Sequence, residues 1–338
     1  RVYPVHHSTA EPVSSRESYR RAMVLVTCVT VTFTYAMAIT IVNVSLPQMQ
    51  GALGASHEEI SWVLTLNIVA TAITLPLCGW LVGRFGERAV ILVATAGFSF
   101  ASLMCGLSDS LEALVFFRVL QGVFGAPLVP VPQALLLSTY PPARHGVVLA
   151  VYSVGAIVGP VSGPIIGGFL TDHYSWRWAF YSLVPASLIA LAFTFRFIER
   201  VTDPGPVRLP TSGFLALAVG VASFQLMLDR GQRADWFESQ EIVMYAVLSV
   251  AGFSLLALNS FTSRRPFLRM TLLTDRNYLV GLALICGFGM INFTPVALLP
   301  TLLQSVQDMS GSDIGLLISA RGLGAIAGTI VYIICSRA

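Results

Sequence analysis

Residues 155–168 read GAIVGPVSGPIIGG, and this stretch indicates the fold more strongly than any other in the chain. Glycine recurs there at every fourth position, at Gly155, Gly159, Gly163 and Gly167. In a helix this spacing makes one smooth stripe, along which the backbone of a neighbouring helix can approach closely. Pro160 and Pro164 each remove one helical hydrogen bond, so we expect this helix to bend. A single pair of such glycines would indicate only an ordinary packing face, whereas four in register with two prolines form a specific pattern.

The glycine stripe lies inside one of many long apolar runs. Hydrophobic residues make up 55% of the 338 residues, and only 11% are charged. A soluble domain needs roughly a quarter of its residues charged, so most of this chain's surface must face lipid. The formal net charge of +3 is too small to indicate a nucleic-acid partner. The composition therefore predicts an all-α polytopic membrane protein.

The apolar runs have the length that a helix needs to cross a hydrocarbon core of about 30 Å. Ten spans are predicted, at about 22–46, 60–81, 89–107, 111–136, 147–170, 179–197, 211–229, 241–261, 277–303 and 314–335. Residues 1–20 are polar and contain prolines, serines and arginines, so they are predicted to form a disordered cytoplasmic tail.

The charged residues predict which side of the membrane each loop occupies. One set of alternate loops is mostly acidic and holds His57, Glu58, Glu59, Asp109, Asp172, Arg177, Asp229, Arg230, Arg233, Asp235, Glu238, Asp308 and Asp313. The other set, with the two ends, holds Arg16, Arg20, Arg21, Arg84, Arg88, Arg144, Arg196, Arg200, Arg208, Arg264, Arg265, Arg269, Arg276 and Arg337. Because arginine marks the cytoplasmic side, both ends of the chain are predicted to lie in the cytoplasm.

Arg118, with Gln121 and Gly122 beside it, is the polar group that the fourth span must accommodate. A guanidinium inside a membrane helix costs about 2.5–3.5 kcal/mol on insertion scales, so it must face the protein interior. One interpretation is a structural arginine bound by backbone carbonyls of kinked helices, and the other is a residue of the transport path. The prolines of the same span, Pro127, Pro130 and Pro132, are predicted to kink it, as in helices that build transporter sites.

Four further polar residues lie within predicted spans: Asn43, Asn67, Asn292 and Arg321. Each could line a central cavity or form a hydrogen bond to a neighbouring helix. The five cysteines and five histidines are scattered, so no metal site or disulfide is predicted and no cofactor is expected. Paired carboxylates, a Ser/His/Asp arrangement and a phosphate loop are all missing from the sequence, which argues against an enzyme.

Several motifs together resemble the major facilitator superfamily. The 155–168 stretch resembles the antiporter motif of its proton-driven exporters, and Arg118-Val-Leu-Gln121-Gly122 resembles the family's RxxQG motif. Residues 79–88, GWLVGRFGER, lie where the family keeps its cytoplasmic loop motif, with Gly79, Arg84, Gly86 and Arg88. Residues 40–47, TIVNVSLP, resemble the first-helix motif of the fourteen-helix drug:proton antiporters. Residues 176–178, 228–231 and 235–237 (WRW, LDRG and DWF) resemble the EmrB type of that family.

The resemblance implies a multidrug exporter that works by alternating access and exchanges drugs for protons. It implies as transport-linked residues Arg118, Gln121, Gly122 and Asn43. Two departures weaken the implied mechanism. The first-helix motif normally begins with an acidic residue where this chain has Ala38, and the predicted spans contain no clearly central Asp or Glu. The loop motif has Gly83 and Glu87 where the general pattern has an Asp and a base.

The resemblance also implies a division of the chain. Residues 21–200 would form an N-terminal six-helix bundle, 201–265 an extra helix pair, and 266–338 the first two helices of an incomplete C-terminal bundle. The implied partners are amphipathic or cationic drugs, protons, and in a bacterial inner membrane a periplasmic adaptor and an outer-membrane channel. The alternative reading is a truncated or non-transporting membrane subunit of the same family.

Overall fold

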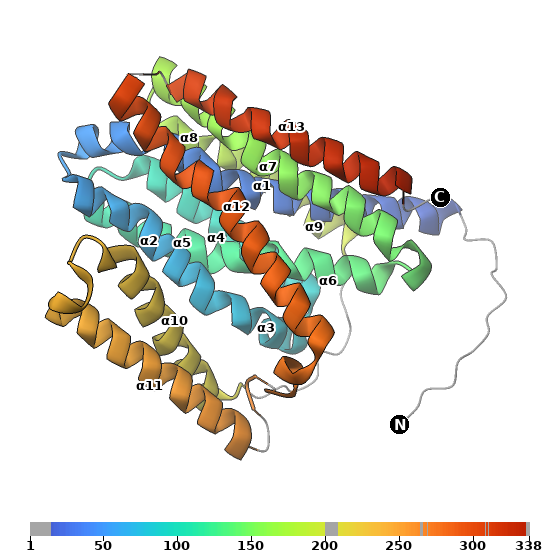
Figure 1. Cartoon of the computed structure of the whole chain (residues 1–338). Helices are drawn as coiled ribbons and strands as arrows, with labels where there is room; N and C mark the ends of the chain where they lie inside the picture. The colour runs from blue at the N-terminus through green and yellow to red at the C-terminus, as the bar shows by residue number, and fades with distance from the viewer. Residues whose placement is uncertain are drawn as a thin grey trace.

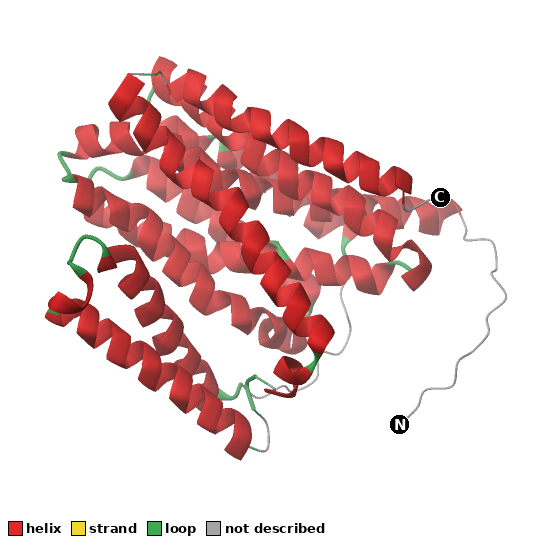
Figure 2. Ribbon diagram, in the orientation of Figure 1, coloured by secondary structure: helices red, strands yellow, loops and turns green. Residues whose placement is uncertain are grey.

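The computed structural model describes residues 15–199, 209–263, 266–268, 270–307, 309 and 311–335, and every regular element within them is a helix (Figure 1, Figure 2). The long helices are α1 (Ser15–Leu53), α2 (His57–Thr74), α4 (Glu87–Leu107), α5 (Leu111–Gly125), α7 (His145–His173), α9 (Leu183–Phe197), α10 (Thr211–Gly231), α11 (Gln240–Thr262), α12 (Arg276–Gln307) and α13 (Gly311–Cys335). The shorter ones are α3 (Cys78–Phe85), α6 (Pro130–Thr139), α8 (Arg177–Tyr181), η1 (Leu75–Leu77), η2 (Ala126–Leu128), η3 (Pro142–Arg144), η4 (Trp236–Glu238) and η5 (Met270–Thr274).

The all-helical prediction is confirmed, and each predicted span coincides with a helical stretch. Eight stretches of the described residues are long and apolar enough to cross a membrane: Ser15–Leu53, His57–Phe85, Glu87–Leu107, Leu111–Thr139, Pro142–His173, Arg177–Phe197, Thr211–Gly231 and Gln240–Thr262. The ninth and tenth predicted spans are the helices α12 and α13. Within α12 the described residues include the shorter apolar stretch Arg276–Ile291. That these last two helices cross the membrane stays a prediction.

The predicted kink of the fourth span is confirmed as a break between α5 and α6. The α-helix stops at Gly125, η2 carries Pro127, and α6 starts at Pro130. Proline lacks the N–H that would continue the ladder, so carbonyl groups at the break need other donors. Thr32 of α1 donates to the Leu128 carbonyl at 2.9 Å, and the Tyr152 hydroxyl of α7 donates to the Val129 carbonyl at 2.8 Å.

The N-terminal end of α1 corrects the predicted tail. The tail was predicted to reach residue 20, whereas α1 already begins at Ser15; residues 1–14 lie outside the described part. Two ion pairs favour this extension beyond the bilayer. Arg21 pairs with Glu17 one turn earlier, and Arg20 lies 2.5 Å from a carboxylate oxygen of Glu199, beyond the end of α9.

The glycine stripe of α7 packs against α1, as a close approach of backbones (Figure 1). A Cβ on Gly159 would lie 2.8 Å from the Phe33 carbonyl oxygen, and one on Gly167 would lie 2.8 Å from the Ile41 carbonyl oxygen. The predicted role of the stripe as a packing surface is therefore confirmed. Despite its two internal prolines, α7 remains one helix from His145 to His173.

Several loops of the predicted outer set contact one another at one end of the helices. Arg177 binds Asp109 at 2.6 Å, and Arg230 binds Glu58 at 2.9 Å; all four belong to the predicted outer set. The third arginine of that set, Arg233, donates to the Ser61 hydroxyl at 2.8 Å. Each arginine that departs from the charge rule is thus bound to neighbours at its own end of the helices.

The helices after residue 209 pack on the first six spans, which comprise α1 to α9, and two of these contacts are extensive. α10 and α11 form a hairpin, in which Gly220 and Gly252 let the backbones approach, and α10 contacts α2. α13 lies along α7 on the side away from this hairpin (Figure 1). Residues 200–208 and 264–265, which join the predicted bundles to the extra pair, lie outside the described part.

Candidate functional site

The buried face of α5 carries the polar group that the sequence singled out. The helix begins at a Ser110 cap, whose hydroxyl accepts from the Ala113 N–H at 3.2 Å. Its buried residues follow helical spacing and are Leu114, Arg118, Gln121, Gly122 and Gly125. Arg118 is seven residues beyond the start of α5, which places its backbone roughly 10 Å along the helix axis.

Arg118 is 3% exposed and is held by two neighbouring groups. Its Nε donates to the Val63 carbonyl of α2 at 3.0 Å, and its Nη1 donates to Oε1 of Gln121. The two interpretations of this residue therefore begin to separate. The carbonyl contact is what a structural arginine would make, whereas the side-chain contact couples the charge to the rest of a polar network.

Gln121 continues that network to α4. Its Nε2 donates to the Ser102 hydroxyl at 2.7 Å, and Ser102 donates in turn to the Phe98 carbonyl at 2.8 Å. Both Gln121 and Ser102 are buried, so each polar atom must find its partner inside the protein. One chain of donors and acceptors thus joins α2, α5 and α4.

Asn67 and Thr71 of α2 bind the backbone of α5 around the same arginine. Asn67 Nδ2 donates to the Arg118 carbonyl at 2.7 Å, and the Thr71 hydroxyl lies 3.2 Å from the Gly122 carbonyl. Of the two alternatives for Asn67, the structure therefore favours the hydrogen bond to a neighbouring helix. A Cβ at Gly122 would collide with the Asn67 carbonyl oxygen, so glycine is required where α2 and α5 approach.

The charge of Arg118 is balanced by dipoles rather than by a carboxylate in the part of the chain that the structure describes. Its guanidinium binds the Val63 carbonyl and the Gln121 amide oxygen, and no ion pair joins it to an Asp or Glu among the described residues. Ala38, at the position where the family motif has an acid, is buried in α1 with 3% exposure. The cluster can therefore hold a fixed positive charge in the bundle, and a titrating partner has to come from elsewhere.

The other motif residues lie apart from this cluster. Thr40 of α1 faces the α7 stripe and donates to the Pro160 carbonyl at 3.2 Å. In a regular helix this carbonyl would accept from the N–H of residue 164, which is a proline and has none. Asn43 is half-buried in α1 and does not belong to the Arg118 network. The side chains of Asn292 and Arg321, on α12 and α13, lie outside the described part.

The cytoplasmic loop motif forms the turn between α3 and α4. Gly86 has φ +80° and ψ 156°, a conformation essentially restricted to glycine, and it ends one helix and begins the next. Arg88 donates to the Phe195 carbonyl at 2.8 Å in the last turn of α9, where a cation also complements the helix dipole. Gly79 and Arg84 are exposed. This contact of Arg88 thus joins α4 to α9, both of which belong to the first six spans, rather than to α12 or α13.

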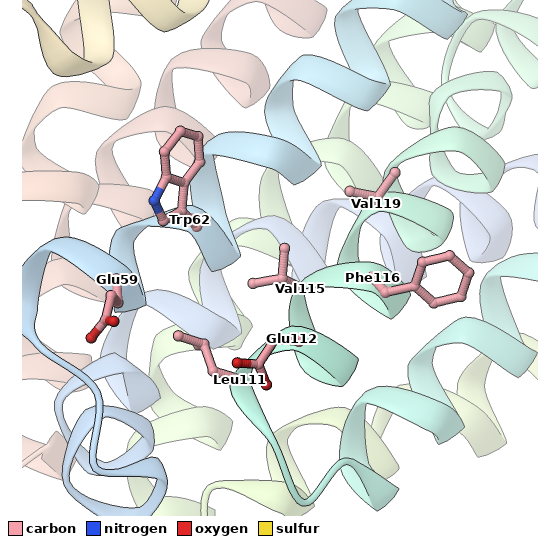
Figure 3. Close-up of a pocket in the computed structure, with 7 residues that line it drawn as sticks. All are labelled: Glu59, Trp62, Leu111, Glu112, Val115, Phe116 and Val119. Atoms are coloured by element: carbon pink, nitrogen blue, oxygen red, sulfur yellow. The ribbon is translucent and has the colours of Figure 1, made fainter.

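A hollow of about 450 Å³ opens between the N-terminal ends of α2 and α5 (Figure 3). It is lined by Glu59, Trp62, Leu111, Glu112, Val115, Phe116 and Val119. The two carboxylates come from the first turns of their helices, and the other side chains are apolar or aromatic (Figure 3). Arg118 is not among the lining residues. The surface of the hollow is almost wholly apolar, and the Glu59 carboxylate accepts from the Ser56 N–H at 2.8 Å in the cap of α2.

Sequence reasoning missed the partners that several outer residues find across the fold. The Thr65 hydroxyl of α2 donates to Oδ2 of Asp229 at 2.7 Å, and Arg230 lies over the Trp62 ring, 5.0 Å from its centroid. Trp176 of the WRW motif is buried, and Arg177 stacks on it. In the sequence, only the motifs drew attention to these residues. The contacts themselves join residues far apart in the chain or depend on the conformation of the turn before α8, so the sequence does not reveal them.

Comparisons with known proteins agree with this architecture. Among solved structures, the proton:xylose symporter XylE superposes with a TM-score of 0.62 at 12% identity, covering 94% of this chain and 69% of that protein. The peptide transporter POT superposes with a TM-score of 0.63 at 16% identity, covering 93% and 68%. Similarities at this level of identity support the fold alone.

Relatives with higher identity are named as export or resistance proteins. The multidrug export protein EmrB of Escherichia coli (strain K12) is 40% identical over 286 residues, covering 84% of this chain and 56% of the relative. The probable multidrug resistance protein EmrY of the same strain is 38% identical over 302 residues, covering 88% and 59%. The fatty acid resistance protein FarB of Neisseria gonorrhoeae is 35% identical over 294 residues, covering 86% and 58%. The chain thus spans less than two thirds of the length of these relatives.

The sequence profile described as Major Facilitator Superfamily matches residues 28–337, which is nearly the whole chain. Together with the helical bundle and the motifs placed within it, this match shows that the chain belongs to the major facilitator superfamily of transporters.

Proposed function

We propose that this chain forms part of a secondary transporter that exports amphipathic or cationic drugs by alternating access, with proton antiport as the energy source. The observation that carries the proposal is the buried guanidinium of Arg118, tied to Gln121 inside a bundle similar to multidrug exporters. A desolvated charge in a membrane bundle is expensive, and such residues usually mark a substrate or ion path.

Arg118 is proposed to act as a fixed charge in the proton cycle. A guanidinium does not lose its proton in proteins, so Arg118 cannot itself carry protons across the membrane. It can instead favour the ionised form of a carboxylate that approaches it in one state of the cycle and not in the other. Gln121 and Asn67 hold the guanidinium and its backbone in place for that encounter.

The remaining parts of the proposal follow the charge pattern and the resemblance. The first six helices form the N-terminal bundle, α10 and α11 form the extra pair, and α12 and α13 begin the C-terminal bundle. The N-terminus lies in the cytoplasm of a bacterium, and the chain lies in the inner membrane. A periplasmic adaptor and an outer-membrane channel would complete the export path.

One observation favours a second candidate, a membrane subunit of the same family that does not transport by itself. Ala38 stands at the acidic position of the first-helix motif, and the described residues place no carboxylate against Arg118. Proton coupling needs a group that changes its charge as it faces each side of the membrane. This candidate predicts membrane insertion without any drug efflux.

Efflux of a fluorescent cationic dye from bacteria that lack their own drug exporters tests the proposal. Cells producing the chain should expel the dye, and collapse of the proton gradient by a protonophore should stop the efflux. Arg118→Ala should slow it by about tenfold or more, since loss of a charged hydrogen bond costs about 1.5–3 kcal/mol. Arg118→Lys should fail as well, because an ammonium lacks the planar fork that reaches both partners.

Arg144→Ala is the control, since it also removes an arginine but one that is exposed, in η3, and outside the motif residues. It should retain efflux at equal amounts of protein in the membrane. Wild-type efflux with Arg118→Ala would remove the role assigned to this arginine. Efflux that continues after the gradient has collapsed would exclude proton antiport, and absence of any efflux would favour the second candidate.

A further inference from the structure

α7 presents a second packing face, distinct from the glycine stripe, and α13 covers it. Val161, Ile165 and Asp172 lie on this face at spacings of four and seven. The facing residues of α13 are Ser312, Gly315, Ser319 and Gly322. α7 thus contacts α1 with one side and α13 with another, and we call the α7–α13 contact the seam.

The middle of the seam is close-packed through small residues. A Cβ on Gly315 would collide with the Pro164 carbonyl oxygen, and one on Gly322 would collide with the Val161 side chain. The Ser319 hydroxyl donates to the Val161 carbonyl at 2.5 Å, and Ser319 is 5% exposed. Ile314 and Ile318 of α13 are buried as well. Water and substrate therefore cannot pass along the seam as it stands.

The outer end of the seam is closed by one carboxylate. Oδ2 of Asp172, in the last turn of α7, accepts from the Ser312 N–H at 2.8 Å and from the Ser312 hydroxyl at 2.6 Å. Ser312 is the second residue of α13, so the carboxylate binds a free N–H at the positive end of that helix. A charge-assisted contact of this kind is stronger than one between neutral groups.

We propose that Asp172 is the outer latch of the transporter: it holds α7 to the N-terminus of α13 while the outer face is closed and releases it when that face opens. The proposal rests on the proposed function, because alternating access moves one bundle against the other around the site. α7 belongs to the first bundle and α13 to the second in that scheme. Opening outward must therefore break the two bonds of Asp172 before the small residues below can separate.

The hydrogen bonds of the latch differ from two other contacts at the predicted outer end in what they join. The ion pair of Arg177 with Asp109 lies within the first six spans. The contact between Ser45 of α1 and Thr171 of α7, whose hydroxyl oxygens are 2.7 Å apart, lies there as well. Rigid-body rocking leaves such contacts intact. Asp172, one residue after Thr171, reaches across to α13 instead.

Disulfide cross-linking separates the two kinds of contact. In a chain whose native cysteines are replaced, Asp172→Cys with Ser312→Cys should form a disulfide on oxidation with copper phenanthroline. Dye efflux should stop and should return after reduction with dithiothreitol. The matched pair, Ser45→Cys with Thr171→Cys, cross-links α7 one residue earlier within the first bundle and should leave efflux unchanged. Efflux that survives the 172–312 cross-link, or a failure of that disulfide to form, would overturn the proposal.

A second measurement does not require transport, so it keeps the latch testable if the proposed function fails. Ser319→Cys places one thiol inside the seam, and its alkylation by a membrane-impermeant maleimide from the outer side reports opening. Asp172→Ala should raise the alkylation rate by about tenfold, the change expected for loss of a capping carboxylate at a helix N-terminus. Asp109→Ala, which removes an outer carboxylate within the first bundle, should leave the rate unchanged.

The outcomes of the two measurements are distinct. Faster alkylation with Asp172→Ala in a chain that never exports dye supports the latch and contradicts the proposed function. An unchanged alkylation rate contradicts the latch, whatever the chain exports.

Discussion

Replacing Gly163 by alanine adds a methyl group where the backbones of α7 and α1 meet, and its cost can be worked out from the structure. The new Cβ would lie 2.9 Å from the Met37 carbonyl oxygen and 3.1 Å from the Ile41 nitrogen, and it would overlap the Thr40 hydroxyl. Two of these three neighbours are backbone atoms of α1. They cannot rotate away, so the helices must move apart by roughly 0.5 Å to restore ordinary contact distances.

Three contributions set the expected change in the free energy of unfolding. Overpacking of this size costs about 1–3 kcal/mol. Displacement of Thr40 also removes its hydrogen bond to the Pro160 carbonyl, worth about 1 kcal/mol. The better helix propensity of alanine returns about 1 kcal/mol. The net destabilisation is therefore about 2 kcal/mol, which is roughly a thirtyfold change in the folding equilibrium.

The same helix supplies the control. A Cβ on Gly146, in the first turn of α7, would meet nothing within 4 Å, so Gly146→Ala changes the same residue type without a clash. Both variants and the parent can be unfolded in mixed micelles by increasing fractions of sodium dodecyl sulfate, followed by circular dichroism. Gly163→Ala should lose about 2 kcal/mol, whereas Gly146→Ala should lose nothing and gain up to about 1 kcal/mol from the helix propensity of alanine. Equal stability of the two variants would refute the close approach of α7 and α1.

Three further predictions use the same unfolding assay. Gly86→Ala should destabilise the chain by about 1–3 kcal/mol, since φ +80° with ψ 156° is strained for any residue with a Cβ; an unchanged midpoint would contradict this turn. Tyr152→Phe should cost about 1–2 kcal/mol by removing the hydroxyl's contacts with the Val129 carbonyl and the Thr32 hydroxyl at the α5–α6 break, and no loss would mean that the Gln133 N–H, 3.3 Å from the same carbonyl, is a sufficient donor. Arg230→Ala and Glu58→Ala, alone and combined, should give a coupling of about 0.2–1 kcal/mol, the range of a solvent-exposed pair; a coupling that is unchanged at high salt would contradict this description of the pair.

The spans and the break of the fourth span were predictable because both follow from local rules, whereas the break of the second span at η1 was not predicted. A bilayer of fixed thickness demands apolar runs of fixed length, and the runs along this chain coincide with the helices. The break between α5 and α6 falls among the prolines that predicted it. The start of α1 was predicted too late, because residues 15–20 look like a polar tail until Arg20 is paired with Glu199, far along the chain.

The glycine stripe shows how far a one-dimensional pattern reaches. Its spacing predicted that some helix would approach α7 closely, and the structure identifies that helix as α1. The second face of α7 carried no comparable signal. Val161 and Ile165 look like lipid-facing residues in the sequence, and Asp172 looks like one more charge of an outer loop.

The site was predictable as residues but not as contacts. The cost of burying a guanidinium predicted that Arg118 faces inward, and it is 3% exposed. Its partner Gln121 is three positions away and was expected on the same face. Val63 and Asn67 are more than 50 positions earlier in the chain. Such pairings depend on how whole helices pack, so a single sequence does not reveal them.

Proton release measured during drug uptake tests the central claim most directly. Inside-out membrane vesicles containing the chain are energised by respiration, and the quenched fluorescence of an acridine dye reports their acidic interior. Addition of a cationic drug should restore part of the fluorescence as protons leave in exchange, and vesicles with Arg118→Ala should show no such recovery. Drug accumulation without any change in the pH gradient would contradict the account.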